Sequence, residues 1–379
     1  MLAFQSRFAR QPRDFRARKC THANFRKWGH CRYFGLLMKI ESHLVELPVP
    51  DASRGIRLDR WLSQQFSELS RARLQELIEA GLVLVNGSAA KASYKLRGGE
   101  RVSIEARPRP PLRAEPESIA LDVPYEDDDL LIVNKPAGMT VHVGAGNSSG
   151  TLVNALLGRG QSLSRGGSQS DALRSGIVHR LDKETSGLII IAKNDLAHAK
   201  LAESFRTRAI KKTYIALVEG RFNNSAGKIN FPVGRDPVHR TRMKAFITSS
   251  NSKISRIHPG RMREALTEWR TLIQFDAATL LEVQLHTGRT HQIRIHFSAI
   301  KHPLVGDTLY GAAPQIRVGK MDLPALGRQF LHAARLAFPH PRTGQWLESR
   351  APLPWGLREF LDALASAEGR SLEPAADYL

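Results

Sequence analysis

Residues 176–192 read GIVHRLDKETSGLIIIA, a charged loop that runs directly into an apolar segment. The run Leu188–Ala192 has the length and composition of a buried strand. A loop that ends at such a strand places Asp182 at a rigid sheet edge, where Arg180 and Lys183 would keep its carboxylate ionised and attract phosphates. Residue chemistry alone favours a catalytic carboxylate and a charged loop with local ion pairs about equally.

This loop belongs to a long mixed α/β region, predicted to form a domain over residues 121–367. Its apolar segments predict strands that include Leu130–Asn134, Leu188–Ala192, Tyr214–Glu219 and Leu280–His286. Asp195 is expected to cap a helix over Leu196–Arg208. Loops are expected over the Gly- and Ser-rich residues 158–176 and the polar residues 249–262, and a C-terminal tail over 368–379.

Residues 54–106 carry the signals of a separate compact unit with two helices followed by strands. The landmarks are Leu58, Trp61, Leu62 and Phe66 at helical spacing, Ser70 as a cap, Gly81 as a stop, strands at Leu82–Val85 and Arg101–Ile104, and turns at Asn86-Gly87 and Gly98-Gly99. Its basic residues are Arg57, Arg60, Arg71, Arg73, Lys95 and Arg97. The stretch LSRARLQELIEAGLVLVNG (69–87) resembles a small RNA-binding module found in a ribosomal protein and in tyrosyl-tRNA synthetases; the alternative is a solvated basic helical hairpin.

The segments that flank this unit have a different composition. Residues 107–120 contain four prolines and are expected to form a semi-rigid linker. Residues 1–38 form a basic tail with no periodic apolar face. Three interpretations of the tail stay open: an RNA-contacting arm, a transit peptide, or translated sequence upstream of a start at Met38, the one that we favour.

Charge is the most informative bulk property. Lys and Arg total 56 against 36 acids, which gives a net charge of +20 and a pI near 10.4. A basic excess spread over several segments indicates a nucleic acid partner, and no basic amphipathic helix favours a membrane surface. The two cysteines, Cys20 and Cys31, cannot supply a disulfide framework or a zinc site by themselves, so we expect a reducing, cytoplasmic setting.

The histidines His286, His291 and His296 raise the question of a metal site. Their five-residue spacing places neighbours on opposite faces of a strand and about 140° apart on a helix. Neither geometry converges on an ion, so no metal is expected there. Thr290 is instead expected to cap a short helix that carries Ile293, Phe297 and Ile300.

Several blocks together resemble the RluA-type RNA pseudouridine synthases. HRLDKETSGLIIIAK (179–193) is similar to the catalytic motif of that family. Four further blocks follow the family's order: LLIVNKPAGMTVH (130–142), KKTYIALVEG (211–220), PVGRDPVHRTRM (232–243) and LHTGRTHQIRIH (285–296). The resemblance extends over most of residues 54–360 and is strongest to the branch that modifies large-subunit ribosomal RNA. It implies an α+β fold, with a mixed-sheet catalytic domain and a small N-terminal α/β RNA-binding module.

The resemblance also implies roles for individual residues. Asp182 would be the catalytic carboxylate, and Arg289 would pair with it. Tyr214 would pack against the uracil and could remove a proton, and Arg180 would fill the space left by a flipped uridine. No metal or organic cofactor is implied, and we expect a monomer that acts on RNA.

Three alternatives to isomerisation on ribosomal RNA stay open. The first is a transfer RNA substrate, and the second is a non-catalytic RNA-binding factor for ribosome assembly. The third is a hydrolytic glycosidase, which normally needs two carboxylates that flank the bond. Near Asp182 only Glu184 is available as a second carboxylate, two positions away in the same loop.

Overall fold

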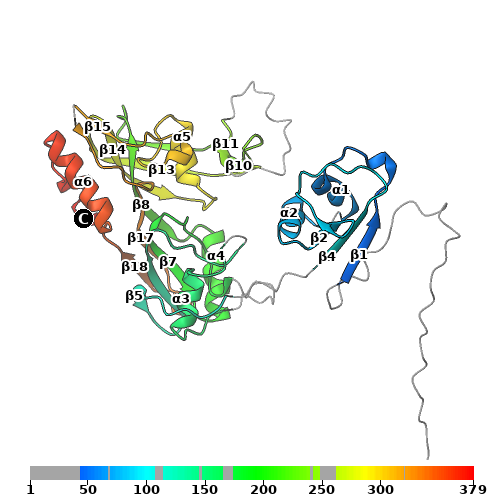
Figure 1. Ribbon diagram of the computed structural model, residues 1–379. Helices are drawn as coiled ribbons and strands as arrows, with labels where there is room; N and C mark the ends of the chain where they lie inside the picture. The colour runs from blue at the N-terminus through cyan, green and yellow to red at the C-terminus, as the bar shows by residue number, and fades with distance from the viewer. Residues whose placement is uncertain are drawn as a thin grey trace, which may run out of the picture. The chain divides into compact units, whose positions relative to one another are not determined.

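The chain divides into two units, Met1–Pro110 and Pro111–Leu379 (Figure 1). The computed structural model describes residues 43–66, 69–106, 114–144, 147–164, 174–239, 242–247, 262–319 and 321–379. The basic tail 1–38 lies outside these ranges, as do part of the loop 158–176 and nearly all of the loop 249–262. No helix in the described ranges is long and apolar enough to cross a membrane.

The first unit is a four-stranded sheet packed against two helices. Its elements are β1 (His43–Pro48), a 3₁₀ turn η2 (Asp51–Ser53), α1 (Leu58–Gln65), α2 (Arg71–Glu79), β2 (Val83–Val85), β3 (Ser88–Ala89) and β4 (Arg101–Ala106), with sheet order β1-β4-β2-β3. The predicted cap is confirmed, because the Ser70 hydroxyl accepts a hydrogen bond from Arg73 N at 3.2 Å. Asn86 and Gly87 both have positive φ (50° and 78°), as expected of the predicted tight turn. The unit begins earlier than residue 54, because β1 completes its sheet.

The second unit is built on a nine-stranded mixed sheet, of order β5-β6-β7-β17-β8-β14-β13-β9 with β18 on β17. The strands are β5 (Asp122–Glu126), β6 (Leu130–Lys135), β7 (Ser186–Ala192), β8 (Lys211–Glu219), β9 (Ala226–Ile229), β13 (Thr267–Gln274), β14 (Ala278–Leu285), β17 (Leu331–Pro339) and β18 (Trp346–Arg350). The pair β7–β17 is parallel, and the other pairs in this sheet are antiparallel. The predicted α+β class is thereby confirmed.

Helices and short strands complete this unit. The helices are α3 (Leu152–Gly158), α4 (Asp195–Arg206), α5 (Gln292–Ala299) and α6 (Trp355–Glu368), with 3₁₀ turns η6 (Thr308–Tyr310) and η7 (Glu373–Tyr378). The short strands are β10 (Val233–Arg235), β11 (Met243–Ala245), β12 (Met262–Arg263), β15 (Arg317–Val318) and β16 (Met321–Asp322). The predicted helix 196–208 corresponds to α4, but its predicted cap is wrong. The Asn194 side chain accepts from Ala197 N at 2.9 Å, whereas the Asp195 carboxylate accepts from the Ser164 hydroxyl.

Two predicted boundaries of the catalytic domain are wrong. The predicted linker 107–120 is too long, because Glu117 N donates to Asn154 O and the Glu117 carboxylate accepts from Gly150 N, which places residues around Glu117 on the second unit. The tail 368–379 is part of the core: it forms η7, and the buried Tyr378 hydroxyl donates to Glu282. Both errors share a cause, since segments without periodicity can still be fixed by single specific contacts.

The central strand β8 shows how the sheet carries two cores. Successive side chains of a strand point to opposite faces. Tyr214, Ala216 and Val218 accordingly pack into one buried cluster, whereas Ile215 and Leu217 pack into another that includes the apolar side of α6. Tyr214 therefore lies on the face opposite α6, and this face also contains the cavity described next.

Candidate active site

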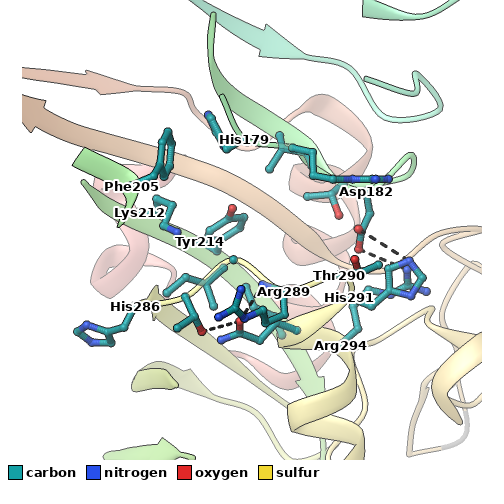
Figure 2. Close-up of a pocket in the computed structure, with 18 of the residues that line it drawn as sticks. His179, Asp182, Phe205, Lys212, Tyr214, His286, Arg289, Thr290, His291 and Arg294 are labelled. Carbon is teal, nitrogen blue, oxygen red and sulfur yellow. Dashed lines mark hydrogen bonds and ion pairs between the residues drawn. The ribbon is translucent and has the colours of Figure 1, made fainter. Parts of the chain in front are cut away.

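A cavity of about 400 Å³ lies on the face of the sheet that carries Tyr214 (Figure 2). Five segments line it: the loop that enters β7, the start of β8, the end of α4, the turn between β14 and α5 with the first turn of that helix, and the start of β17. Asp182 and Tyr214, predicted from distant motifs, both lie in this cavity together with Arg180 and Arg289. The structure thus brings the predicted catalytic set into one site.

The loop that carries Asp182 is fixed by groups buried beneath it. The Lys135 ammonium is fully buried and donates to the carbonyls of Pro136, Met139 and Lys183. Arg328 donates to Glu184 O at 3.0 Å, so two cations hold consecutive peptide groups of the loop. Burial lowers the pKa of Lys135 to about 8, although the charges of Glu184 and Asp182 oppose the shift. Sequence reasoning missed Arg328 because it lies on a distant segment.

A glycine at the start of β7 allows this loop to approach β17 closely. Gly187 has φ 112°, and a Cβ there would lie 2.3 Å from Ala333 O. Any side chain would therefore displace the parallel pairing between β7 and β17, which includes the pair Ala333 and Gly187. The position of the loop that carries Asp182 depends on this contact between backbones.

The partner of Asp182 is Arg294, and the predicted pair with Arg289 is wrong. Arg294 Nη1 lies 3.5 Å from Asp182 Oδ2, and His291 Nε2 lies 3.8 Å from Oδ1. The Arg294 guanidinium is itself held by two hydrogen bonds to the buried Asp307, at 2.6 and 2.8 Å. No hydrogen bond within the described residues reaches the Asp182 side chain, so its oxygens remain open to the cavity.

His291 has an uncommon backbone conformation beside this carboxylate. It precedes α5 with φ 55°, in the left-handed region that a residue with a side chain seldom adopts. Its Nδ1 lies 2.7 Å from the Tyr310 hydroxyl, and burial lowers its pKa, against the influence of Asp182. Burial thus disfavours the charged form of the imidazole that faces Asp182. His291 rather than Thr290 occupies the cap position of α5, and no side chain caps that helix.

The turn that carries Arg289 is held by the buried side chain of Gln292. Its amide oxygen accepts from Arg289 N and from the Thr287 hydroxyl, and its amide nitrogen donates to Leu266 O and to the Thr267 hydroxyl. The Arg289 Nε donates to Glu264 O at 3.1 Å. Arg289 thus makes a side-chain contact with Glu264 O, and no ion pair joins it to Asp182 among the described residues.

Tyr214 lies in the cavity wall and is also part of the core, with 6% of its surface exposed. Burial, and next the charge of Asp182, raises the pKa of its hydroxyl. The side chain is therefore a neutral phenol at physiological pH, able to donate a hydrogen bond but a weak base as it stands.

The predicted RNA-binding residues fall into different environments. Arg180 is exposed at the cavity. In the first unit, Arg57 and Arg71 both donate to the buried Asp59, and Arg73 pairs with Glu76. The remaining three, Arg60, Lys95 and Arg97, are exposed.

The three histidines rejected as metal ligands have separate partners. His286 pairs with Glu268, His291 contacts Tyr310, and the buried His296 contacts Thr267 and Phe231 O. In the described ranges, the group with metal-ligand spacing is Asp127, Asp129 and His340. The Asp129 carboxylate in that group already accepts two hydrogen bonds from Arg342, so the cluster serves as a structural network.

Comparisons with known proteins identify the family. The family model "RNA pseudouridylate synthase" matches residues 129–299, and the "S4 domain" model matches residues 56–102. A protein of Xanthomonas campestris named "Ribosomal large subunit pseudouridine synthase D" is 40% identical over 341 residues, 89% of this chain and 97% of its own. The chain belongs to the RNA pseudouridylate synthase family.

Further relatives of this pseudouridine synthase support the assignment. The Escherichia coli protein named "Ribosomal large subunit pseudouridine synthase D" is 39% identical and covers 83% of this chain and 93% of its own length. A solved human structure, "RNA Pseudouridylate Synthase Domain Containing 4", is 25% identical with a TM-score of 0.50, over 64% of this chain and 92% of that one. The protein is accordingly an isomerase, and its first unit is an RNA-binding S4 domain.

Proposed function

We propose that this enzyme converts specific uridines to pseudouridine in large-subunit ribosomal RNA, with Asp182 as the catalytic carboxylate. The names of the relatives and the net charge of +20 support the substrate. The observation that carries the catalytic assignment is the state of Asp182, a carboxylate oriented by Arg294 and His291 at 3.5 and 3.8 Å yet free of hydrogen bonds within the described residues.

The reaction needs one bond broken and one formed. The bond between ribose C1′ and uracil N1 breaks, the uracil turns, and C1′ bonds to C5; the proton on C5 is lost and N1 gains one. Asp182 attacks C1′ or stabilises its developing positive charge, and Arg294 keeps the carboxylate oriented. Attack on C1′ and stabilisation of its positive charge both need an ionised carboxylate with open oxygens.

Tyr214 packs against the uracil in this proposal. Because burial and Asp182 raise the pKa of its hydroxyl, Tyr214 starts as a hydrogen-bond donor. It can take up the C5 proton only after it has given its own hydroxyl proton to uracil N1, the atom that gains one; bond formation at Asp182, which removes the nearby negative charge, would favour that release. The intermediate must be kept from water, which would otherwise yield an abasic site.

RNA is held outside the cavity by basic residues. Arg180 fills the space that the flipped uridine leaves, and the exposed Arg60, Lys95 and Arg97 of the S4 domain contact backbone phosphates. Residues Arg57, Arg71 and Arg73 are secondary in this respect, because each has a carboxylate partner. We expect the enzyme to act as a cytoplasmic monomer.

The test is to incubate the full-length enzyme with unmodified large-subunit ribosomal RNA and, separately, with unmodified transfer RNA, and to map pseudouridine in both. We expect product at defined uridines of the ribosomal RNA, and none with Asp182→Asn. Pseudouridine formed only in transfer RNA would show that the substrate is transfer RNA, while the proposed reaction would stand. Free uracil in place of pseudouridine would identify a hydrolase, and tight binding without product would identify a binding factor.

A further inference from the structure

The end of the cavity away from Asp182 is lined by basic and aromatic side chains. Lys212 lies two residues before Tyr214 on β8, on the same face of the strand, and its ammonium sits 5.6 Å from the centre of the Phe205 ring. In Figure 2, Tyr214 lies between Lys212 and the Asp182 end of the cavity, and Arg289 projects from the facing turn. Strand geometry separates Lys212 and Tyr214 by about 6.6 Å along the backbone.

Lys212 is a largely shielded cation without a counter-charge. Its ammonium makes no ion pair or hydrogen bond with any residue in the described parts of the chain. Burial, and next the charge of Arg289, lowers the pKa of Lys212 to about 8. A desolvated charge that faces a like charge opposes folding, and burying it is unfavourable unless it is paired.

Arg289 is the second cation of this end. Its Nε donates to Glu264 O, while its terminal nitrogens make no hydrogen bond with the described residues. Gly288, next to Arg289 in the turn, lies close to Lys212: a Cβ at that position would lie 3.6 Å from the Lys212 ammonium. Because glycine has no side chain, the ammonium remains accessible from the turn. Two cations converge on the cavity, and the acid at the site, Asp182, is paired with Arg294 instead.

We propose that Lys212 and Arg289 form an anion subsite that binds a backbone phosphate beside the target uridine while its base lies between Tyr214 and Asp182. The subsite rests on the proposed function, because the phosphate belongs to the RNA substrate. Lysine binds phosphate as a point charge and arginine as a planar donor, so the pair suits a phosphate that enters with a flipped nucleotide. The phosphate supplies the negative charge that Lys212 and Arg289 lack among the described residues. It also fixes where the ribose lies relative to Asp182.

The experiment compares Lys212→Met with Lys211→Met in the full-length enzyme. Lys211 is the matched control, because it lies next on the same strand, points to the other face, and holds its ammonium 5.5 Å from the Trp346 ring. We expect Lys212→Met to weaken RNA binding about tenfold and to lower the slope of log affinity against log salt by roughly 0.7–0.9, the share of one phosphate contact. Lys211→Met should leave both unchanged, and equal effects of the two variants would overturn the proposal.

A second measurement identifies the group that is bound. RNA with a neutral methylphosphonate at the phosphate on either side of the mapped uridine is titrated against wild type, Lys212→Met and Arg289→Met. If the subsite binds one of these phosphates, a methylphosphonate at that position abolishes the effect of Lys212→Met and of Arg289→Met. The reason is that the neutral phosphate and the two substitutions all remove the same interaction. Effects that add for both phosphates would show that Lys212 contacts something else, such as a uracil carbonyl.

Thermal unfolding distinguishes an anion subsite from a lysine retained for the fold. A lysine retained for the fold would lower Tm when replaced, whereas Lys212→Met should match or exceed the wild-type Tm, since it removes a desolvated charge. A clear fall in Tm would overturn the proposal. Affinity is measured apart from turnover, so wild-type enzyme that binds through Lys212 but forms no pseudouridine would refute the proposed function and leave the anion subsite standing.

Discussion

Two carboxylates, one in each unit, contrast a side chain that stabilises the fold with one that we propose takes part in the chemistry. Asp59 in the S4 domain is fully buried and accepts hydrogen bonds from Arg57, Arg71 and Gln75 at 2.7–3.2 Å. Asp182 keeps 17% of its side chain exposed, and its two cation contacts lie at 3.5 and 3.8 Å. The structural carboxylate has used its lone pairs, whereas the carboxylate in the cavity is oriented and left open.

The difference extends to the arginines around each acid. Burial alone would raise the pKa of Asp59, but the hydrogen bonds from Arg57 and Arg71 outweigh it and hold that pKa well below its usual range. Around Asp182, Arg294 is shared with Asp307, which takes its two short hydrogen bonds. If Asp182 is the reacting group, its partner Arg294 makes its two short hydrogen bonds to Asp307 and leaves the Asp182 oxygens open.

The largest expected effect is at Asp182. Asp182→Asn keeps the shape of the side chain and removes its charge, so turnover should fall by roughly 10⁴-fold or more, while RNA affinity stays within a few-fold of wild type. The measurement is single-turnover pseudouridine formation, with affinity determined in parallel. Turnover close to that of wild type would remove Asp182 from its catalytic role.

Tyr214→Phe should have the next largest effect. The ring and its packing remain, and loss of the hydroxyl should lower turnover by about 10²–10⁴-fold with affinity unchanged. The raised pKa keeps the hydroxyl protonated in the free enzyme. The wild-type rate should therefore not increase with pH between pH 7 and 9, as it would if an ionised phenol were the reactive form. A pH–rate profile that climbs tenfold per unit in this range, and is flat in the variant, would contradict a neutral starting state.

Arg294→Gln is expected to lower turnover by roughly 10²-fold, the scale of a lost electrostatic contact in an active site. Its matched control is Arg289→Gln, which should act mainly on KM because Arg289 does not contact Asp182. Separate measurements of kcat and KM for both variants test the assignment directly. The reverse pattern, with kcat lost at position 289, would restore the partner expected from sequence.

These two arginines also show what can be predicted from the sequence and what cannot. The cap at Ser70 is confirmed, and Asp182 and Tyr214 lie in one cavity as their motifs indicated, because each belongs to a motif or local signal that spans a few residues. The choice of Arg294 over Arg289 depends on how the turn after β14 enters α5, and that geometry is set by the side chain of Gln292 and by Asp307. Lys135 and Arg328 could not be predicted for the same reason, since contacts between distant segments leave no local pattern.

Asp59→Asn tests the stabilising half of the comparison. The substitution weakens three hydrogen-bonded contacts, and because Arg57 and Arg71 are half exposed we expect only about 1–2 kcal/mol of lost stability in the S4 domain. The folded-state pKa of Asp59 is lowered, so the contribution is present above its unfolded pKa, near 4, and is lost as pH falls below that value. Hydrogen exchange in α1 and α2 at pH 7 gives the difference, and catalysis on a short RNA should be unaffected. Equal protection in variant and wild type would show that the network does not stabilise the domain.

The smallest expected effect separates arginines used within the fold from those available to RNA. Arg60 is exposed, and no ion pair joins it to an acid among the described residues, whereas Arg57 is committed to Asp59. Arg60→Gln should therefore lower the salt slope of RNA binding by roughly 0.9, as one lost duplex phosphate contact would, and leave stability unchanged. Arg57→Gln should lower the stability of the S4 domain and change the slope less. The measurements are salt titrations of RNA binding and thermal unfolding for both variants. If Arg60→Gln and Arg57→Gln lower the salt slope equally, the ion pair with Asp59 does not prevent Arg57 from binding RNA. The distinction between arginines that stabilise the fold and arginines that bind RNA would then be wrong.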